Sequence, residues 1–189
     1  MIRVIGGKYK GKRLKKVPGT VVRPMPDKLK ESLFSILQDE VRGSVFLDGF
    51  AGTGSVGIEA LSRGADRIVF VDKYYPAVKV IKINVAKCGV EERVRVIHKE
   101  FNRAVIQLSK EKAKFDLIFL DPPYKLVEER NPLKVIYKRK VLGEGGKIIL
   151  RHFYKTDFDA KFFDLQRQVT IGDDTLAFYS EEIATLRPR

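Results

Sequence analysis

Residues 115–124, FDLIFLDPPY, combine an apolar run with a carboxylate, two prolines and a tyrosine. The apolar residues before Asp121 predict a buried strand, which Pro122 and Pro123 end because proline cannot continue a strand's hydrogen-bond ladder. The proline pair also predicts a rigid, extended loop. Since ligands of open α/β sheets bind at the carboxyl ends of the strands, Asp121 and Tyr124 are expected to face a ligand.

Such a loop suits the methylation of an exocyclic amine, whose lone pair is delocalised into its ring. The Asp121 carboxylate and the Pro122 carbonyl can each accept a hydrogen of the amine, which turns the lone pair towards a methyl donor. The ring of Tyr124 can stack on the base and hold its plane. We therefore take Asp121, Pro122, Pro123 and Tyr124 as the candidate catalytic residues.

A second stretch, VFLDGFAGTGSVG at residues 45–57, predicts a buried strand, a tight turn and the start of a helix. Gly52, Gly54 and Gly57 follow the G-x-G-x-x-G spacing of loops that bind nucleotide cofactors, where side chains would block the approach of the ligand. The helix would direct backbone N–H groups at that ligand. The alternative interpretation of the spacing is a tight strand-to-helix turn that needs small residues.

Acidic residues near this loop favour a cationic cofactor. Asp48 ends the strand and Glu59 lies in the first turns of the helix, and two carboxylates would repel the pyrophosphate of NAD. They would suit S-adenosylmethionine (AdoMet), which carries a sulfonium and an ammonium group. Asp72 ends the next apolar strand, 20 residues after Gly52, where an acid binds the ribose hydroxyls of either cofactor.

The 189 residues carry a formal net charge of +13, which is concentrated at the N-terminus. Residues 1–30 contain ten lysines and arginines and one acid, Asp27, and so hold +9 of the total. Such a segment is expected to bind the phosphates of a nucleic acid. Residues 2–16 predict a short hairpin with basic faces, on which Tyr9 could stack on a base.

Other features exclude several classes of protein. A single cysteine, Cys88, rules out an internal disulfide and a multi-cysteine metal site, so no metal is expected. No apolar run approaches the roughly 18 residues that cross a bilayer, and the start of the chain lacks the apolar core of a signal peptide. We expect a cytoplasmic monomer that does not bind membranes.

From residue 45 onward strand and helix patterns alternate, which is typical of a parallel sheet with helices on both faces. We expect a basic hairpin and helix at residues 1–43, as an extension of the same domain, and a catalytic unit at residues 44–189. Asp27 is expected to cap the first helix. The expected strands span 45–50, 68–72, 94–100, 115–121 and 146–152, the expected helices span 28–40, 56–63, 75–88, 101–110 and 133–142, and a hairpin of 162–171 and 175–180 completes the sheet.

Six segments spread over nearly the whole chain resemble, in this order, the RsmD-type family: IRVIGGKYKGKRL, RPMPDKLKESLFSIL, LDGFAGTGSVGIEALSRGA, FVDK, DLIFLDPPY and GDDTLAFY. The resemblance implies an α/β protein, a Rossmann-like class I AdoMet-dependent methyltransferase with a seven-stranded sheet and a small N-terminal hairpin and helix. It implies methylation of guanine N2 in 16S rRNA, within a small ribosomal subunit or its assembly intermediate.

The resemblance also implies roles for individual residues. Asp48, Gly52 and Gly54 would contact the methionine part of AdoMet, Asp72 would bind its ribose, and Glu100 with Phe101 its adenine. The full set expected at the cofactor is Asp48, Phe50, Gly52, Gly54, Asp72, Lys73, Glu100 and Phe101. The basic start and the segment 23–30 would bind RNA, chiefly through Arg3, Lys8, Lys10, Lys12, Arg13, Arg23 and Lys28.

The residues leave other functions open. D-P-P-Y also occurs in enzymes that methylate adenine N6 in DNA or RNA, although a chain this short without a target-recognition domain argues against a sequence-specific DNA enzyme. An RNA-binding assembly factor that has lost catalysis is a second alternative, against which the intact acidic and glycine residues argue. An NAD-dependent oxidoreductase is a third.

Overall fold

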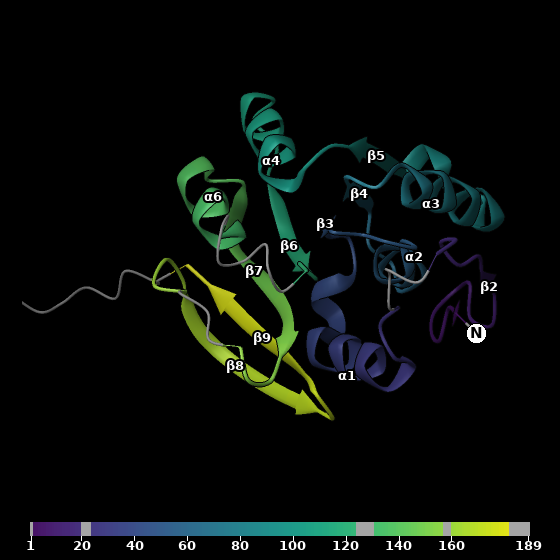
Figure 1. Ribbon diagram of the computed structural model, residues 1–189, viewed down its shortest axis with the longest axis horizontal. Coiled ribbons are helices and arrows are strands. Elements are labelled where there is room, and N and C mark those ends of the chain that lie inside the picture. The colour runs from purple at the N-terminus through teal and green to yellow at the C-terminus, as the bar shows by residue number, and fades with distance from the viewer. Residues whose placement is uncertain (1, 20–23, 124–130, 157–159, 182–189) are drawn as a thin grey trace, which may run out of the picture.

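The structure is a computed structural model that describes residues 2–19, 24–123, 131–156 and 160–181. Its largest element is a seven-stranded sheet in the order β5-β4-β3-β6-β7-β9-β8 (Figure 1). Neighbouring strands are parallel from β5 to β7, and β9 is antiparallel to β7 and β8. The strands are β3 (Val45–Gly49), β4 (Arg67–Asp72), β5 (Val94–His98), β6 (Phe115–Leu120), β7 (Leu142–Phe153), β8 (Asp164–Ile171) and β9 (Asp174–Ser180).

Helices cover both faces of this sheet. Side chains of α1, α2 and α3 form one buried apolar cluster with the first face, and side chains of α4 and α6 form another with the second face. Among the described residues no helix is both long and apolar enough to cross a bilayer. The helices are α1 (Asp27–Leu37), α2 (Ser55–Ser62), α3 (Tyr75–Cys88), α4 (Phe101–Lys110) and α6 (Pro132–Arg139), with short 3₁₀ turns η1 (Gln38–Val41) and η2 (Glu91–Arg93).

The alternation of side chains along each strand decides which residues meet. On β3, Phe46 packs into the cluster with α1, α2 and α3, whereas Leu47 packs into the opposite one. On β6, Phe119 belongs to the first cluster. Asp48 and Asp121 each lie two residues beyond a member of that cluster, so both carboxylates project on the same face at the carboxyl edge of the sheet.

The predicted order of strands and helices is confirmed, including the hairpin β8–β9. One strand differs: β7 starts at Leu142, because Leu142 pairs with Phe115 ahead of a bulge. The expected cap of the first helix is wrong. Asp27 is the first residue of α1, Pro26 precedes it without a side-chain cap, and the Asp27 carboxylate accepts a hydrogen bond from Arg3 Nε at 3.1 Å.

A separate two-stranded sheet, β1 (Ile2–Arg3) with β2 (Arg13–Leu14), precedes α1. The loop between these strands is bound to α2 through Glu59, whose two carboxylate oxygens accept the backbone N–H groups of Ile5 and Gly6 at 2.8 and 2.7 Å. Ser62 adds a second attachment by accepting from Tyr9 N at 2.8 Å. Glu59 is fully buried here, so its expected place beside the glycine loop is wrong.

Two basic side chains neutralise Glu59. Arg63 Nε donates to its Oε1 at 2.9 Å, and Lys30 Nζ lies 3.5 Å from its Oε2. Lys30 is 1% exposed and donates to the Arg3 carbonyl at 2.7 Å, and its burial lowers its pKa. Lys30 therefore holds the hairpin against α1 and α2 and cannot contact RNA.

Tyr9 is also buried, in the apolar cluster with α1, α2 and α3, and Lys8 and Lys12 place their ammonium groups 5.6 and 5.5 Å from its ring centre. Its expected use as a surface for stacking on a base is therefore wrong. The aromatic ring supports the two lysines through cation–π contacts.

We expect Glu59→Gln to destabilise the protein by about 3–5 kcal/mol, because it leaves the buried Lys30 ammonium without its counter-charge. Urea unfolding measures the change. Glu40→Gln is the matched control: Glu40 contacts Lys147 at 2.7 Å but is 44% exposed, so its loss should cost about 1 kcal/mol or less.

The double variant Lys30→Met/Glu59→Gln removes both charges and should lose less stability than Glu59→Gln alone. Equal losses for Glu59→Gln and Glu40→Gln would contradict the role of Glu59 as the buried attachment of the hairpin.

Candidate active site

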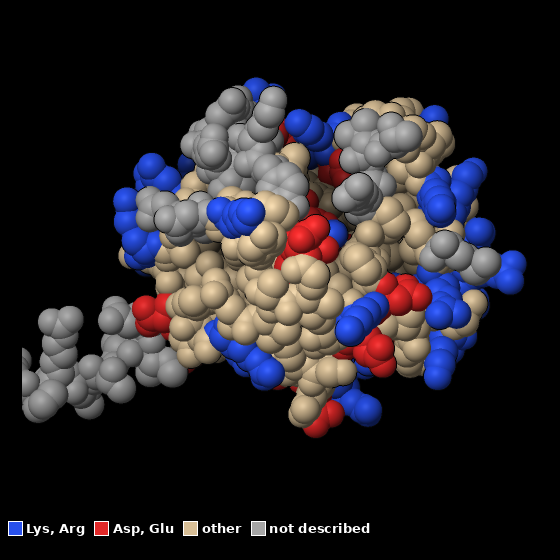
Figure 2. Space-filling model, turned by 60° about the horizontal axis from the view of Figure 1, so that its bottom comes forward, with Lys and Arg blue, Asp and Glu red and all other residues tan. Residues whose placement is uncertain are grey.

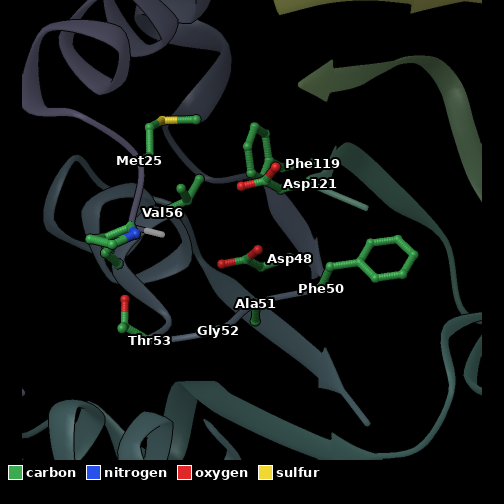
Figure 3. Close-up of a pocket in the computed structure, with 11 residues that line it drawn as sticks. Met25, Asp48, Phe50, Ala51, Gly52, Thr53, Val56, Phe119 and Asp121 are labelled. Atoms are coloured by element: carbon green, nitrogen blue, oxygen red, sulfur yellow. The ribbon is translucent and has the colours of Figure 1, made fainter. Parts of the chain in front are cut away.

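An open pocket lies between the glycine loop, the end of β6 and the segment before α1, with about 330 Å³ of empty space that includes part of the open solvent. The Asp48 and Asp121 carboxylates point into the same space from neighbouring strands, while the ring of Phe50 points away from it (Figure 3). Eleven residues line the pocket: Pro24, Met25, Asp48, Phe50, Ala51, Gly52, Thr53, Ser55, Val56, Phe119 and Asp121.

Asp48 is a buried carboxylate at the base of this pocket, 1% exposed. Its Oδ2 accepts a hydrogen bond from Gly57 N at 2.9 Å, in the first turns of α2. Burial raises its pKa well above the usual 3.8, the Gly57 hydrogen bond opposes this shift, and the nearby Asp121 and Asp72 add to it. A cation entering the pocket would therefore stabilise the ionised form of Asp48.

The glycines of the loop have separate structural reasons. Gly54 has a φ of +75° and is the residue before α2, a left-handed conformation that glycine adopts without strain. Gly57 packs against β4, since an added Cβ would lie 2.3 Å from Phe70 Cε1. Gly54 and Gly57 therefore serve the tight turn and the packing of α2 on β4. Gly52 lines the pocket, where the lack of a side chain leaves room for a ligand.

Asp72 joins the glycine loop to the end of β4. Its Oδ2 accepts from Gly52 N and its Oδ1 from Tyr74 N, both at 2.8 Å. The side chain is half-buried, and each carboxylate oxygen keeps a second lone pair for another donor. Lys73 is exposed beside it, and its carbonyl bonds the ring of His98 at 3.1 Å.

Glu100 follows β5 at the same edge of the sheet and caps α4 by accepting from Arg103 N at 3.1 Å. Its other oxygen, Oε1, is buried and has no hydrogen-bond partner in the described part of the chain, and the same holds for Asn102 Oδ1. Buried acceptors without donors are rare in proteins, so these two oxygens can accept a hydrogen bond from a ligand or a water. Phe50 and Phe101 stack beside them with ring centres 4.9 Å apart.

Asp121 is held by an ion pair across the sheet. Its Oδ2 accepts from Arg151 Nη1 at 2.8 Å, and Arg151 Nε donates to Asp174 Oδ1 at 3.1 Å. Burial raises the pKa of Asp121, Arg151 opposes the shift and Asp174 adds to it. The Asp121 side chain keeps 31% of its surface exposed, so solvent in the open pocket moderates the effect.

Comparisons with known proteins agree over almost the whole chain. A family model described as "Conserved hypothetical protein 95" matches residues 2–180. The chain is 37% identical over 182 residues to the Bacillus subtilis protein "Putative rRNA methyltransferase YlbH", covering 95% of this chain and 99% of that one. The chain belongs to the RsmD-type family.

Two further similar proteins support the assignment. "Ribosomal RNA small subunit methyltransferase D" of Haemophilus influenzae is 35% identical over 125 residues, which cover 65% of this chain and 64% of that protein. The solved structure of the Escherichia coli protein yhhF matches with a TM-score of 0.80 at 26% identity and covers 96% of this chain and 98% of that one. The fold is the Rossmann-like class I methyltransferase fold.

The structure brings most of the expected cofactor residues to one edge of the sheet. Asp48, Phe50 and Gly52 line the pocket, and Gly54 stands at the start of α2. Of the target loop, Pro122 is buried and Pro123 exposed. The two expected residues Tyr124 and Arg23 lie outside the described residues.

Sequence reasoning missed the pocket's wall before α1. Pro24 and Met25 line the pocket, and Met25 is buried. The sequence predicts only RNA binding for the segment 23–30. Arg151, in β7, was also missed as the partner of Asp121, because its sequence position gives no sign of a contact 30 residues away.

The expected RNA-binding residues occupy the surface of the N-terminal hairpin and α1. The six that the structure describes, Arg3, Lys8, Lys10, Lys12, Arg13 and Lys28, are all exposed. Figure 2 shows basic side chains gathered along the margin of the molecule on the side where Figure 1 draws β2, and acidic ones near the middle of the face. Basic side chains also lie at the opposite margin of this face, and acidic ones also at its lower edge, so the hairpin side is one of several basic regions that Figure 2 shows.

We expect Asp48→Asn to stabilise the ligand-free protein and weaken AdoMet binding. An acid whose pKa is raised in the folded state loses stability as pH rises from 3.8 towards that raised value, and asparagine removes this loss while still accepting from Gly57 N. Thermal unfolding at neutral pH and titration calorimetry measure the two effects.

Asp66→Asn is the control, because Asp66 is 61% exposed and far from the pocket edge of the sheet. A fall in melting temperature for Asp48→Asn, with AdoMet affinity unchanged, would refute the assignment of Asp48 as a buried carboxylate kept for a cation.

Proposed function

We propose that this protein transfers a methyl group from AdoMet to the exocyclic N2 of a guanine in 16S rRNA. The observation that carries the proposal is that Asp48 and Asp121 face one pocket from adjacent strands. The first suits a cationic donor and the second suits an amine that must give up a proton. A loop built for a diphosphate would not place two carboxylates there.

The described residues fit AdoMet. The cofactor supplies a methyl group activated by a sulfonium. Asp48 would hold its cationic part against the glycine loop, Asp72 would accept its ribose hydroxyls with the lone pairs left free by Gly52 and Tyr74, and Lys73 stands next to that site. The unpartnered Oε1 of Glu100 suits an amine donor such as that of adenine, beside the ring of Phe101.

Asp121 and the loop after it would hold the acceptor. Its carboxylate and the carbonyl of Pro122 accept the two hydrogens of the exocyclic amine, which fixes the direction of the nitrogen lone pair. The transfer would form one N–C bond and break one C–S bond, whose electron pair would stay on sulfur, and the amine proton would pass to the Asp121 carboxylate that accepts its hydrogen bond. Alignment of the nitrogen contributes more than a strong base does, because the reaction is a direct displacement.

The substrate class follows from the family. Relatives that match 65% and 79% of this chain are named as ribosomal RNA small subunit methyltransferases, and the basic hairpin would supply a phosphate-binding surface. The choice of guanine N2 rests on the resemblance of the target loop to that family. An adenine N6 methyltransferase is the nearest alternative, since Asp121 and Pro122 would hold either amine.

The first test is methyl transfer from labelled AdoMet to 16S rRNA, to partly assembled small subunits and to duplex DNA, followed by nucleoside analysis. We expect N2-methylguanine in the RNA or the particles. N6-methyladenine would move the function to the alternative, and no transfer to any substrate would overturn the proposal.

Asp121→Ala should reduce transfer by at least about 100-fold, the scale of losing an aligning group at the reacting atom, while AdoMet still binds. Single-turnover assays and calorimetry separate the two. Asp173→Ala, an exposed acid in the turn before β9, is the control. Equal loss of binding and transfer would mean that Asp121 belongs to the cofactor site.

Replacing Lys10, Lys12 and Arg13 together by glutamine should weaken RNA binding and lower the slope of log K against log salt by about 2 to 3, since each phosphate contact releases a counterion. Filter binding at several salt concentrations measures the slope. The control replaces Lys110 of α4, Lys112 of the turn after α4 and Arg139 of α6, which are all exposed. It makes the same charge change and should leave the slope nearly unaltered. Equal slopes for the two triple variants would remove the hairpin from the interface.

A further inference from the structure

The ion pairs of Arg151 connect three neighbouring strands of the sheet. Asp121 follows β6, Arg151 lies in β7, and Asp174 begins β9, which is paired with β7. All three lie two residues from members of the apolar cluster under α1, α2 and α3, namely Phe119, Ile149 and Leu176, so they project on one face. Arg151 is 8% exposed, so it is buried between the two acids.

The two contacts use different nitrogens of one rigid group. Nη1 donates to Asp121 at 2.8 Å and Nε donates to Asp174 at 3.1 Å. Because the guanidinium is planar and its donors are fixed, Asp174 sets the plane in which Nη1 meets Asp121. In the described part of the chain no hydrogen bond reaches the second oxygen of Asp121, Oδ1, and Asp121 lines the pocket.

We propose that Arg151 is a positioning residue that holds Asp121 by its Oδ2 and leaves Oδ1 to accept the hydrogen of the target amine. Asp174 holds the guanidinium in the required plane. The inference rests on the proposed methyl transfer. It adds the group that orients the Asp121 carboxylate, which in turn binds the target amine. Arg151 touches neither substrate nor cofactor in this assignment.

The charges around Asp121 make this arrangement necessary. Asp48 faces Asp121 from β3, Asp174 from β9 and Arg151 from β7, so one cation stands among three acids. Burial and Asp174 raise the pKa of Asp121, and Arg151 opposes both effects. Without Arg151 the pKa of Asp121 would rise further, and a protonated carboxyl no longer offers a full acceptor to the amine.

The rate of methyl transfer should depend on pH through the ionisation of Asp121. At pH values below the pKa of Asp121, its ionised fraction decreases. The fall of kcat on the acidic side of the pH profile, the acidic limb, therefore marks the loss of the carboxylate that accepts the amine hydrogen. Arg151→Met should move this limb to higher pH by about one unit or more, which is a tenfold or larger loss of rate on the acidic side. At pH values above the shifted limb Asp121 is ionised again, so the rate should rise to a plateau, which should lie below that of the wild type because Asp121 is no longer held by a guanidinium.

The test measures kcat against pH with AdoMet and RNA both saturating, for the wild type, Arg151→Met, Arg151→Lys and Asp174→Asn. Arg151→Lys keeps the charge and should restore much of the acidic limb, while its single ammonium lacks the fixed plane and should give a lower plateau. Asp174→Asn removes an acid that raises the pKa of Asp121, so its limb should not move upward, and only its plateau should fall.

The AdoMet affinity and the melting temperature of each variant show whether it is folded. If Arg151 only stabilised the fold, its replacement would lower the rate at every pH without moving the acidic limb. Carbon-13 NMR titration of the Asp121 carboxyl reports its protonation directly and needs no activity. A wild type that transfers no methyl group overturns the proposed function, whereas an active wild type with an unmoved limb and an unmoved Asp121 titration in Arg151→Met overturns this inference.

Discussion

The hydrogen bond from Gly57 N to the buried Asp48 carboxylate is the contact on which the site depends. It joins the end of β3 to α2 across the glycine loop, so the loop's shape and the place of the charge are fixed together. Burying a carboxylate without a cation beside it is unfavourable, so Asp48 lowers the stability of the ligand-free protein. A cationic ligand would return that free energy as affinity.

The same helix connects the pocket to the basic hairpin. The N-terminal turns of α2 contact Asp48, and its later turns carry Glu59 and Ser62, which bind the hairpin's backbone. Glu59 has its charge balanced by Lys30 and Arg63, whereas Asp48 has no such partner among the described residues. Glu59 therefore stabilises the fold, whereas Asp48 is left without a counter-charge. The surface proposed to bind RNA is thus attached to the same helix that follows the glycine loop.

The sequence predicts the local features well. Alternating apolar patterns and glycine or proline breaks locate the strands and helices to within a few residues, and the order of motifs predicts that Asp48, Asp72 and Asp121 meet at one edge. Side-chain pairing across the sheet is different, because it depends on which face a residue takes and what lies opposite. Glu59 and Lys30 were therefore misplaced, and the contact of Arg151 with Asp121 was not anticipated.

Proton release on cofactor binding tests the account most directly. Titration calorimetry of AdoMet in buffers of different ionisation enthalpy, repeated at several pH values and with NAD in its place, counts the protons exchanged. The account predicts that AdoMet binding releases protons below the raised pKa of Asp48 and tightens as pH rises, while NAD binds weakly or not at all. AdoMet affinity that does not change with pH, or tighter binding of NAD, would contradict the claim that a buried carboxylate selects a cationic cofactor.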